Sequence, residues 1–246
     1  MDKLLYVAMS GASQTLRAQT ANSHNLANAN TTGFKADLSA FQSRAVTGPG
    51  FASRVYATDA SVGWDSSVGS QITTGNPFDV AVQGQGFIAV QDSQGKEAYT
   101  RAGDLHVDPN GQLLTAAGLQ VLGDSGPLSV PPYSTATVAP NGTISIVPLG
   151  QTPQTSSNVG RLKLVNPPSD TISRGADGLF RTNDGQPAEA DASTTIASGV
   201  LEGSNVDLAG SMVNMIELSR NFDLQIKALH TAEDNASSSA KLLQSS

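Results

Sequence analysis

The 246-residue chain contains no cysteine, which excludes disulfide bonds, a thiol nucleophile and metal sites with cysteine ligands. Aromatic residues make up only 5% of the chain, charged residues 14%, and the formal net charge is −7. A nucleic-acid-binding protein would show a basic patch, so we expect no nucleic-acid partner. No apolar run approaches the roughly 20 residues that span a bilayer, so we expect no direct membrane insertion.

The first residues resemble a signal peptide, because Lys3 precedes a short apolar run at 4–9. That run is shorter than a usual signal-peptide core, and a helical pattern continues through it. We therefore expect no cleaved signal peptide.

The three histidines give no support for catalysis. His24 and His230 fall on the polar flanks of predicted helices, and His106 lies between Asp104 and Asp108. A carboxylate–histidine pair could transfer protons or bind a metal, but no second His or Glu has ligand spacing nearby. The sequence also has no nucleophile elbow and no phosphate-binding loop. We expect no catalytic residue, no metal and no cofactor.

The C-terminal part of the chain has the pattern of a long amphipathic helix. From Met212 onward, steps of three and four residues place one stripe on a helix about 48 Å long. Its apolar members are Met212, Met215, Phe222, Ile226, Leu229, Ala236, Ala240 and Leu243. The stripe is narrow and has few large residues after Leu229, so this helix needs partner helices. Asp207 or Ser204 can cap its start.

The same alternation occurs at the other end of the chain, where it includes Leu5, Met9, Ala12, Leu16 and Leu26. A single segment of this kind would usually be a surface helix of an ordinary domain. Two such segments flank a middle of different composition, which favours a terminal helical hairpin that associates with other copies. The apolar stripes of the two helices are therefore our predicted assembly interface.

The middle of the chain has the pattern of short β-strands. Residues 78–82 alternate in polarity, and turn sequences recur at 108–111, 140–142, 177–178 and 184–185. Short strands with hairpin turns and no helical period predict an antiparallel sandwich or a partly closed barrel.

The predicted fold class is therefore α+β, with a coiled-coil-like hairpin of terminal helices and a central antiparallel β domain. The expected boundaries are 1–32 for the N-terminal helix and 201–246 for the C-terminal helix. Between them, 33–75 would form an irregular extended connecting segment with a few short strands, and 76–200 the β domain.

Several ordered motifs resemble bacterial flagellar rod and hook proteins. An Asn-Leu-Ala-Asn…Thr-x-Gly-Phe-Lys signature near the N-terminus of that family is matched by Asn25, Leu26, Ala27, Asn28, Thr31, Gly33, Phe34 and Lys35. Residues 74–87, 99–103 and 111–115 match landmarks of the family's β domain. Ser204, Asn205 and Val206 then lead into its C-terminal signature. At 219–223 the chain has Ser-Arg-Asn-Phe-Asp where the family often has Gln-Arg-Ala-Tyr-Glu, so one hydroxyl is lost.

The resemblance implies a structural subunit of the flagellar basal-body rod that transmits motor torque and has no enzymatic activity. Residues 160–165, 177–181 and 200–206 are most similar to proximal-rod members, and a distal-rod subunit is the alternative. Implied partners are other rod subunits, proximal and distal, and the flagellar type III export apparatus. The implied location is the periplasmic part of the rod. An alternative from another class is an extracytoplasmic β-domain binding protein or enzyme with oligomerising helices, although such proteins usually have clustered aromatics or carboxylates.

Overall fold

The computed structural model describes residues 4–45, 55–152 and 155–244. Its chain divides into two compact units. Unit 1 consists of Met1–Ala29, Ala36–Trp64 and Val206–Ser246, and unit 2 of Asn30–Lys35 and Asp65–Asn205. The two helices and many antiparallel strands confirm the α+β class. No helix among the described residues has the length and hydropathy needed to cross a membrane.

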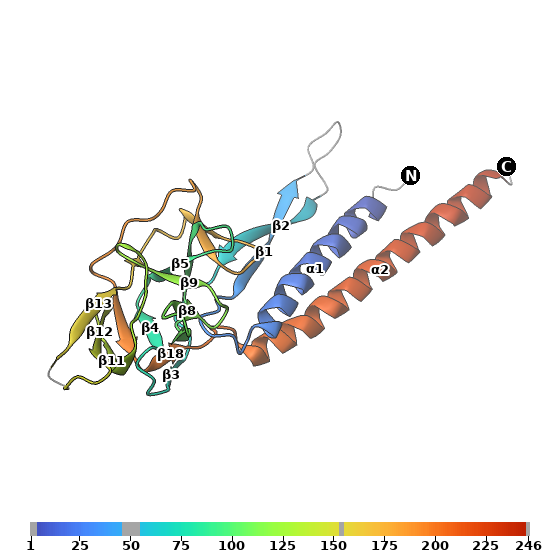
Figure 1. Ribbon diagram of the computed structural model, residues 1–246. Coiled ribbons are helices and arrows are strands. Elements are labelled where there is room, and N and C mark those ends of the chain that lie inside the picture. The colour runs from blue at the N-terminus through green and yellow to red at the C-terminus, as the bar shows by residue number, and fades with distance from the viewer. Residues whose placement is uncertain (1–3, 46–54, 153–154, 245–246) are drawn as a thin grey trace. The chain divides into compact units, whose positions relative to one another are not determined.

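Unit 1 contains both helices, α1 (Leu4–Ala27) and α2 (Leu208–Gln244), and one β-ribbon (Figure 1). The ribbon pairs β1 (Asp37–Ala45) with β2 (Val55–Trp64) in antiparallel register, with an irregularity between Leu38 and Ser39. The sequence predicts an irregular connecting segment with a few short strands here. Strands of 9 and 10 residues form instead. They are held by backbone hydrogen bonds to each other, and a Ser-, Gly- and Thr-rich sequence has no clear alternation of polarity that would predict them.

The two helices run antiparallel, because residues late in α1 contact the start of α2 and residues early in α1 contact its middle. The side-chain amide of Asn22 donates to the carbonyl of Ser211 over 2.7 Å, whereas Gly11 lies opposite Gln225. The start of α2 is capped by Asp207, whose carboxylate accepts from the Ala209 N–H at 3.0 Å. Of the two proposed capping residues, Asp207 is therefore confirmed.

Unit 2 is built from short antiparallel strands. They are β3 (Gln71–Thr73), β4 (Val80–Gln83), β5 (Phe87–Gln91), β6 (Glu97–Thr100), β7 (Leu105–Val107), β8 (Leu113–Thr115), β9 (Gln120–Gly123), β10 (Gly126–Pro127), β11 (Tyr133–Val138), β12 (Thr143–Pro148), β13 (Ser157–Arg161), β14 (Leu164–Val165), β15 (Ile172–Arg174), β16 (Phe180–Thr182), β17 (Thr195–Ser198) and β18 (Val200–Glu202).

The largest sheet of unit 2 follows the order β15-β16-β6-β5-β9-β8-β7, with β10 beside β9 and β14 beside β5. A second sheet has the order β11-β12-β13, and two further pairs join β17 to β4 and β18 to β3. One apolar core receives fully buried residues from several of these sheets, among them Val82, Ile88, Val121, Ile144 and Ile196.

The predicted turn chemistry is present where strands reverse. The Asp108 carboxylate accepts from the backbone N–H groups of Asn110 and Gln112, and Gly111 has a φ of 81°. Asn141 accepts from the Thr143 N–H in the same way, beside a Gly142 with a φ of 83°. These two of the four predicted turns are confirmed, since short polar side chains and glycine satisfy the reversing backbone.

Candidate assembly surface and buried charge cluster

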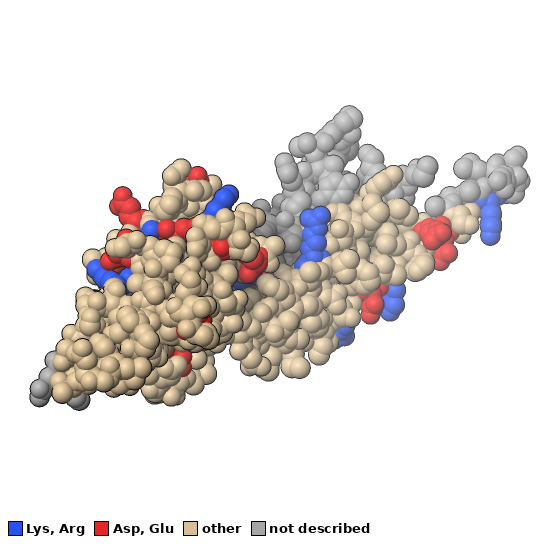
Figure 2. All heavy atoms as spheres, viewed as in Figure 1, with Lys and Arg blue, Asp and Glu red and all other residues tan. Residues whose placement is uncertain are grey.

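Both helices of unit 1 leave large apolar side chains open to solvent. On α1 and α2 these side chains are between 37% and 61% exposed, and they are Leu5, Tyr6, Met9, Leu16, Leu208, Met212, Val213, Ile216 and Leu224. We call them the exposed apolar residues. Figure 2 shows uncharged residues over most of the visible face of the molecule. Large apolar side chains left exposed in this number on two helices are typical of sites of association.

The spacing of these residues separates them from the line on which the helices meet. Apart from Asn25 near its end, the buried residues described on α1 are small: Ala8, Ala12, Thr15 and Ala18. On α2 the contact line has the heptad spacing 211, 215, 218, 222, 225, 229 and 232, and its ends, Ser211 and Ala232, are buried. Met215 and Gln225 lie on this line and contact α1. Small residues on α1 therefore let α2 approach closely, while the larger apolar residues Leu5, Met9 and Leu16 of α1 remain exposed.

This arrangement corrects the single stripe expected on α1. Leu5, Met9 and Leu16 are exposed and only Ala12 is buried, because the contact line is shifted toward Ala8 and Thr15. On α2, Met212 is exposed, and the residues that are partly buried are Met215, Phe222, Ile226 and Leu229, as is Leu26 on α1. The side chains of Ala236, Ala240 and Leu243 lie outside the described residues. Whether the predicted set forms the assembly interface stays a prediction.

Sequence reasoning missed five exposed apolar residues: Tyr6, Leu208, Val213, Ile216 and Leu224. A signal was available for part of this set, since 208, 212 and 216 recur at steps of four and so share one side of α2. The stripe with heptad spacing drew attention away from this second line of apolar residues on α2.

The first motif of the N-terminal signature fixes local structure in unit 1. Asn25 is buried, and its amide donates to the Asp37 carbonyl at 2.9 Å and accepts from the Asp37 N–H at 2.7 Å. The Asn25 side chain thus makes the two hydrogen bonds at Asp37 that the backbone of a neighbouring strand would otherwise make. Asn28 donates to the His24 carbonyl, which closes the end of α1.

The end of that signature contributes to a buried charge cluster in unit 2. Lys35, Arg101 and Glu202 are each no more than 2% exposed. The Lys35 ammonium donates to one Glu202 oxygen at 2.7 Å, and the Arg101 guanidinium donates to the other, also at 2.7 Å. Lys35 also donates to the Ser67 carbonyl at 2.6 Å, and the Gly69 N–H donates to Glu202 at 3.0 Å.

The electrostatics of this buried charge cluster depend on the pairing. Burial lowers the pKa of Lys35, and the bond to Glu202 only partly opposes it. Burial alone would raise the pKa of Glu202, but the hydrogen bond from Lys35 and the charge of Arg101 hold it below its ordinary value. Removing one partner of a buried ion pair leaves an uncompensated buried charge. Because Glu202 pairs with both Lys35 and Arg101, its loss would leave two buried positive charges without a carboxylate.

Arg101 connects the cluster to the strands of unit 2. Its guanidinium donates to the carbonyls of Val82 and Gly84 and lies 5.6 Å from the centre of the Phe87 ring. Its Nε is buried and has no hydrogen-bond partner among the described residues. The sequence motifs contained Lys35, Arg101 and Glu202, but nothing in their spacing indicated that they meet.

All three histidines are exposed. His106 is exposed, and burial raises the pKa of the neighbouring Asp104. His24 is 2.8 Å from Asp37, and His230 lies beside Glu233 on an exposed turn of α2. Across the part of the chain that the structure describes, no three His, Cys, Asp or Glu side chains are grouped to hold a metal ion.

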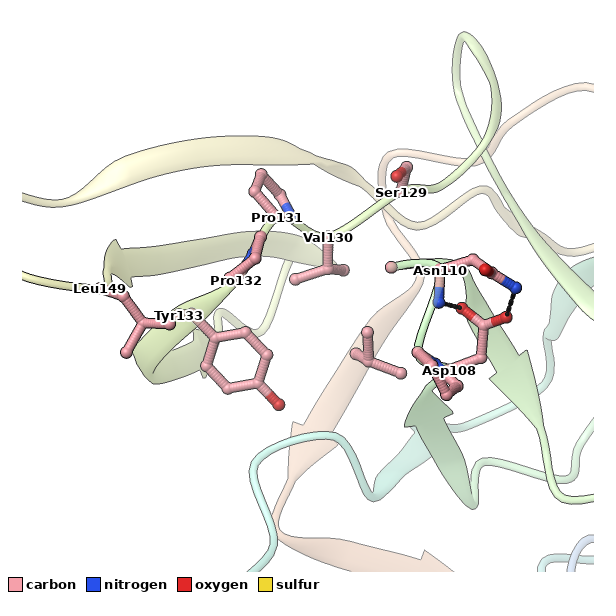
Figure 3. Close-up of a pocket in the computed structure, with 11 residues that line it drawn as sticks. Asp108, Asn110, Ser129, Val130, Pro131, Pro132, Tyr133 and Leu149 are labelled. Carbon is pink, nitrogen blue, oxygen red and sulfur yellow. Dashed lines mark hydrogen bonds between the residues drawn. The ribbon is translucent and has the colours of Figure 1, made fainter.

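Unit 2 also has a pocket of about 410 Å³. Figure 3 shows Tyr133 and Leu149 on one side of it and Asp108 with Asn110 on the other. The Asp108 carboxylate accepts from both the N–H and the side-chain amide of Asn110. These polar groups serve the turn, so the pocket gives no convergent set of groups for chemistry.

These features define a class: an α+β protein whose terminal helices carry an exposed apolar surface suited to association. Three parts of the chain match known families. Residues 5–35 match "Flagella basal body rod protein", 81–146 match "Flagellar hook protein FlgE/F/G D1 domain", and 197–242 match "Flagellar basal body rod FlgEFG protein C-terminal".

Full-length relatives agree with these matches. The flagellar basal-body rod proteins FlgF of Escherichia coli strain K12 and Salmonella typhimurium strain LT2 are each 42% identical, over 100% of this chain and 100% of their own length. A FlgG from Buchnera aphidicola subsp. Acyrthosiphon pisum is 32% identical over 86% of this chain and 88% of its own. The chain belongs to the flagellar basal-body rod protein family, as the motifs predicted. It is more similar to these FlgF proteins than to that FlgG.

Proposed function

We propose that this chain is a FlgF-like structural subunit of the proximal rod, which assembles through its terminal helices into the tubular shaft that carries torque to the hook. The observation that carries the proposal is the set of exposed apolar residues on both helices. Full-length similarity to FlgF proteins supports the same conclusion.

The helices supply the contact surface by the following arrangement. The heptad spacing on α2 supports a coiled-coil-like hairpin, in which small residues of α1 meet the contact line of α2. The exposed apolar residues then face neighbouring subunits. Fully burying a Leu, Ile or Met contributes about 1.5–3 kcal/mol relative to full exposure, and these side chains still have a third to two thirds of that burial to gain. Several such contacts together stabilise an assembly that no single pair could.

The proposal includes the partners and the location that the family implies. Other proximal- and distal-rod subunits would cover the exposed apolar residues, and the flagellar export apparatus would deliver the chain to the periplasmic part of the rod. We propose no enzymatic reaction, since the relatives are named as rod proteins and the polar groups of unit 2 are used in turns and ion pairs.

The test places a charge on the exposed apolar surface. We expect Ile216→Asp to abolish motility in a strain that lacks its own copy of this protein, because an aspartate cannot be buried against a neighbour without a partner. The matched control is Asn214→Asp, which adds the same charge half a turn earlier on α2 at an exposed polar position. Full motility with Ile216→Asp would contradict the proposal.

A distal-rod position is the second candidate, because FlgG proteins also match over most of the chain. The two positions are separated by complementation. We expect the wild-type chain to restore swimming in a strain that lacks FlgF and not in one that lacks FlgG. The reverse result would move the chain to the distal rod.

A further inference from the structure

The chain passes between unit 2 and unit 1 at four points, between residues 29 and 30, 35 and 36, 64 and 65, and 205 and 206. Three stretches of unit 2 adjoin these crossings: 30–35, 65–70 and 200–205. We call them the root stretches. Each one lies within unit 2, and any load that passes along the chain from unit 1 must enter unit 2 through them.

The root stretches are bonded to one another rather than only to the sheet around them. The Glu202 carbonyl accepts from the Gly33 N–H at 2.8 Å, while its side chain accepts from Lys35 and from the Gly69 N–H. Asn205 donates its backbone N–H to the Phe34 carbonyl at 3.3 Å. Each root stretch therefore contacts the others through Glu202 or its near neighbours.

Asn205 completes this set of bonds. Its side-chain amide donates to the carbonyls of Asp65 and Ser67 at 3.0 and 3.1 Å, and the Gly203 N–H donates to the Ser70 carbonyl at 2.7 Å. The Ser67 carbonyl also accepts from Lys35. This one oxygen in 65–70 therefore bonds to both 30–35 and 200–205.

Backbone meets backbone at two places in this arrangement. A Cβ at Gly33 would lie 2.2 Å from the Arg101 backbone carbon, and one at Gly69 would lie 2.0 Å from the Gly203 carbonyl oxygen. No side chain fits at either position. The Gly69 contact thus fixes the separation of 65–70 from 200–205, and the Gly33 contact fixes 30–35 against the backbone beside Arg101.

We propose that Glu202 is the positioning residue that joins the root stretches into one piece, so that a force on any crossing is shared by all four and passed through Arg101 to the strands of unit 2. The sharing of force rests on the proposed function. The joining of the root stretches does not.

The charges allow this role to be distinguished from simple filling of space. Glu202→Gln barely changes shape, yet it leaves the Lys35 and Arg101 cations buried with no carboxylate. Lys35→Met changes the side chain more, but it leaves Arg101 and Glu202 as a balanced pair. If Glu202 positions the root stretches, the isosteric change is the more damaging of the two. If the cluster only fills space, the order is reversed.

The experiment measures amide hydrogen exchange on the full-length chain. For Glu202→Gln we expect exchange in all three root stretches to rise together by about a hundredfold or more, with a much smaller rise in β5 and β9. The control is Glu97→Gln, which removes the carboxylate of a partly buried ion pair with Lys163 in the same unit but away from the crossings. It should leave the root stretches unchanged.

Three results would overturn the proposal: a rise confined to 200–205, an equal rise in every strand of unit 2, or a larger effect of Lys35→Met than of Glu202→Gln. If Glu202→Gln does not fold, Lys35→Met decides. It should loosen 30–35 by about tenfold and leave 200–205 protected. No change in 30–35 would then contradict the role of the cluster.

The mechanical part is tested by swimming in media of increasing viscosity. We expect cells with Glu202→Gln to lose speed at a lower viscosity than cells with Glu97→Gln, although both variants enter the rod. Equal loss of speed contradicts the sharing of force. If the wild-type chain restores no motility, the proposed function fails while the exchange result still decides whether Glu202 joins the root stretches.

Discussion

Replacing Gly33 with alanine should destabilise unit 2 far more than the added methyl group suggests. Gly33 has a φ of 67°, a left-handed conformation that costs an L-residue about 1–2 kcal/mol. Its new Cβ would lie 2.2 Å from the backbone carbon of Arg101 and 2.4 Å from the Ala102 nitrogen. Those atoms belong to the backbone and cannot rotate away, so the root stretch must move, at a further cost of about 1–3 kcal/mol.

The control for this prediction is Gly118→Ala. Gly118 has a φ of 78° in a turn of the same unit, but a Cβ there meets no atom within 4 Å. We expect this variant to lose only the conformational part, about 1–2 kcal/mol. Urea unfolding of the full-length proteins, followed by circular dichroism, measures the difference. The reasoning is refuted if the two alanines lower the free energy of unfolding equally.

Four further outcomes are expected. Phe222→Asp should prevent pairing of α1 with α2 and abolish motility while unit 2 still folds, and motility with this variant would contradict the contact line on α2. Because the pKa of Glu202 lies below its ordinary 4.5, the stability it contributes is complete above about pH 4.5 and lost as pH falls through the lowered pKa. Glu202→Gln should remove that part of the acid transition, as urea unfolding at a series of pH values would show. His106→Gln should leave motility intact, and a loss with normal assembly would point to proton transfer or metal binding at this residue. We also expect the helices to become fully ordered only on assembly, because a monomer leaves their large apolar residues uncovered. In dilute monomer, proteolytic cuts should therefore cluster before about Gly33 and after about Ser204, and protection of both ends would refute this coupling.

The parts that the sequence predicts well are those with local causes. Asp108 and Asn141 each accept from backbone N–H groups within four residues, so their turns follow from neighbouring residues alone. The periodicity of the sequence predicts the terminal helices. The Asn-rich signature predicts where α1 ends, and Asp207 predicts where α2 begins. Family motifs then identified the chain without any structural step.

The parts that were missed depend on distant partners. The contact line of α1 was misplaced because hydrophobicity ranks Leu and Met above Ala, whereas close helix packing selects Ala8, Ala12 and Ala18. Glu202 pairs with Lys35 across 167 residues, and no local pattern encodes that meeting. The sequence motifs contained Lys35, Arg101 and Glu202, but only the folded structure shows that they form one buried charge cluster.

The interleaving of the two units also governs when the chain can fold. The pairing of α1 with α2 and the pairing of Lys35 with Glu202 can form only after residues beyond 200 have left the ribosome. Contacts that join the two ends of a chain form slowly, because the entropy of closing the intervening loop is lost before the contacts form. A newly made chain with this topology therefore stays open for longer than one whose domains are continuous in sequence. The residues after 200 complete both units, because they supply α2 to unit 1 and Glu202 to unit 2. The order of the segments along the chain therefore sets when these last contacts can form.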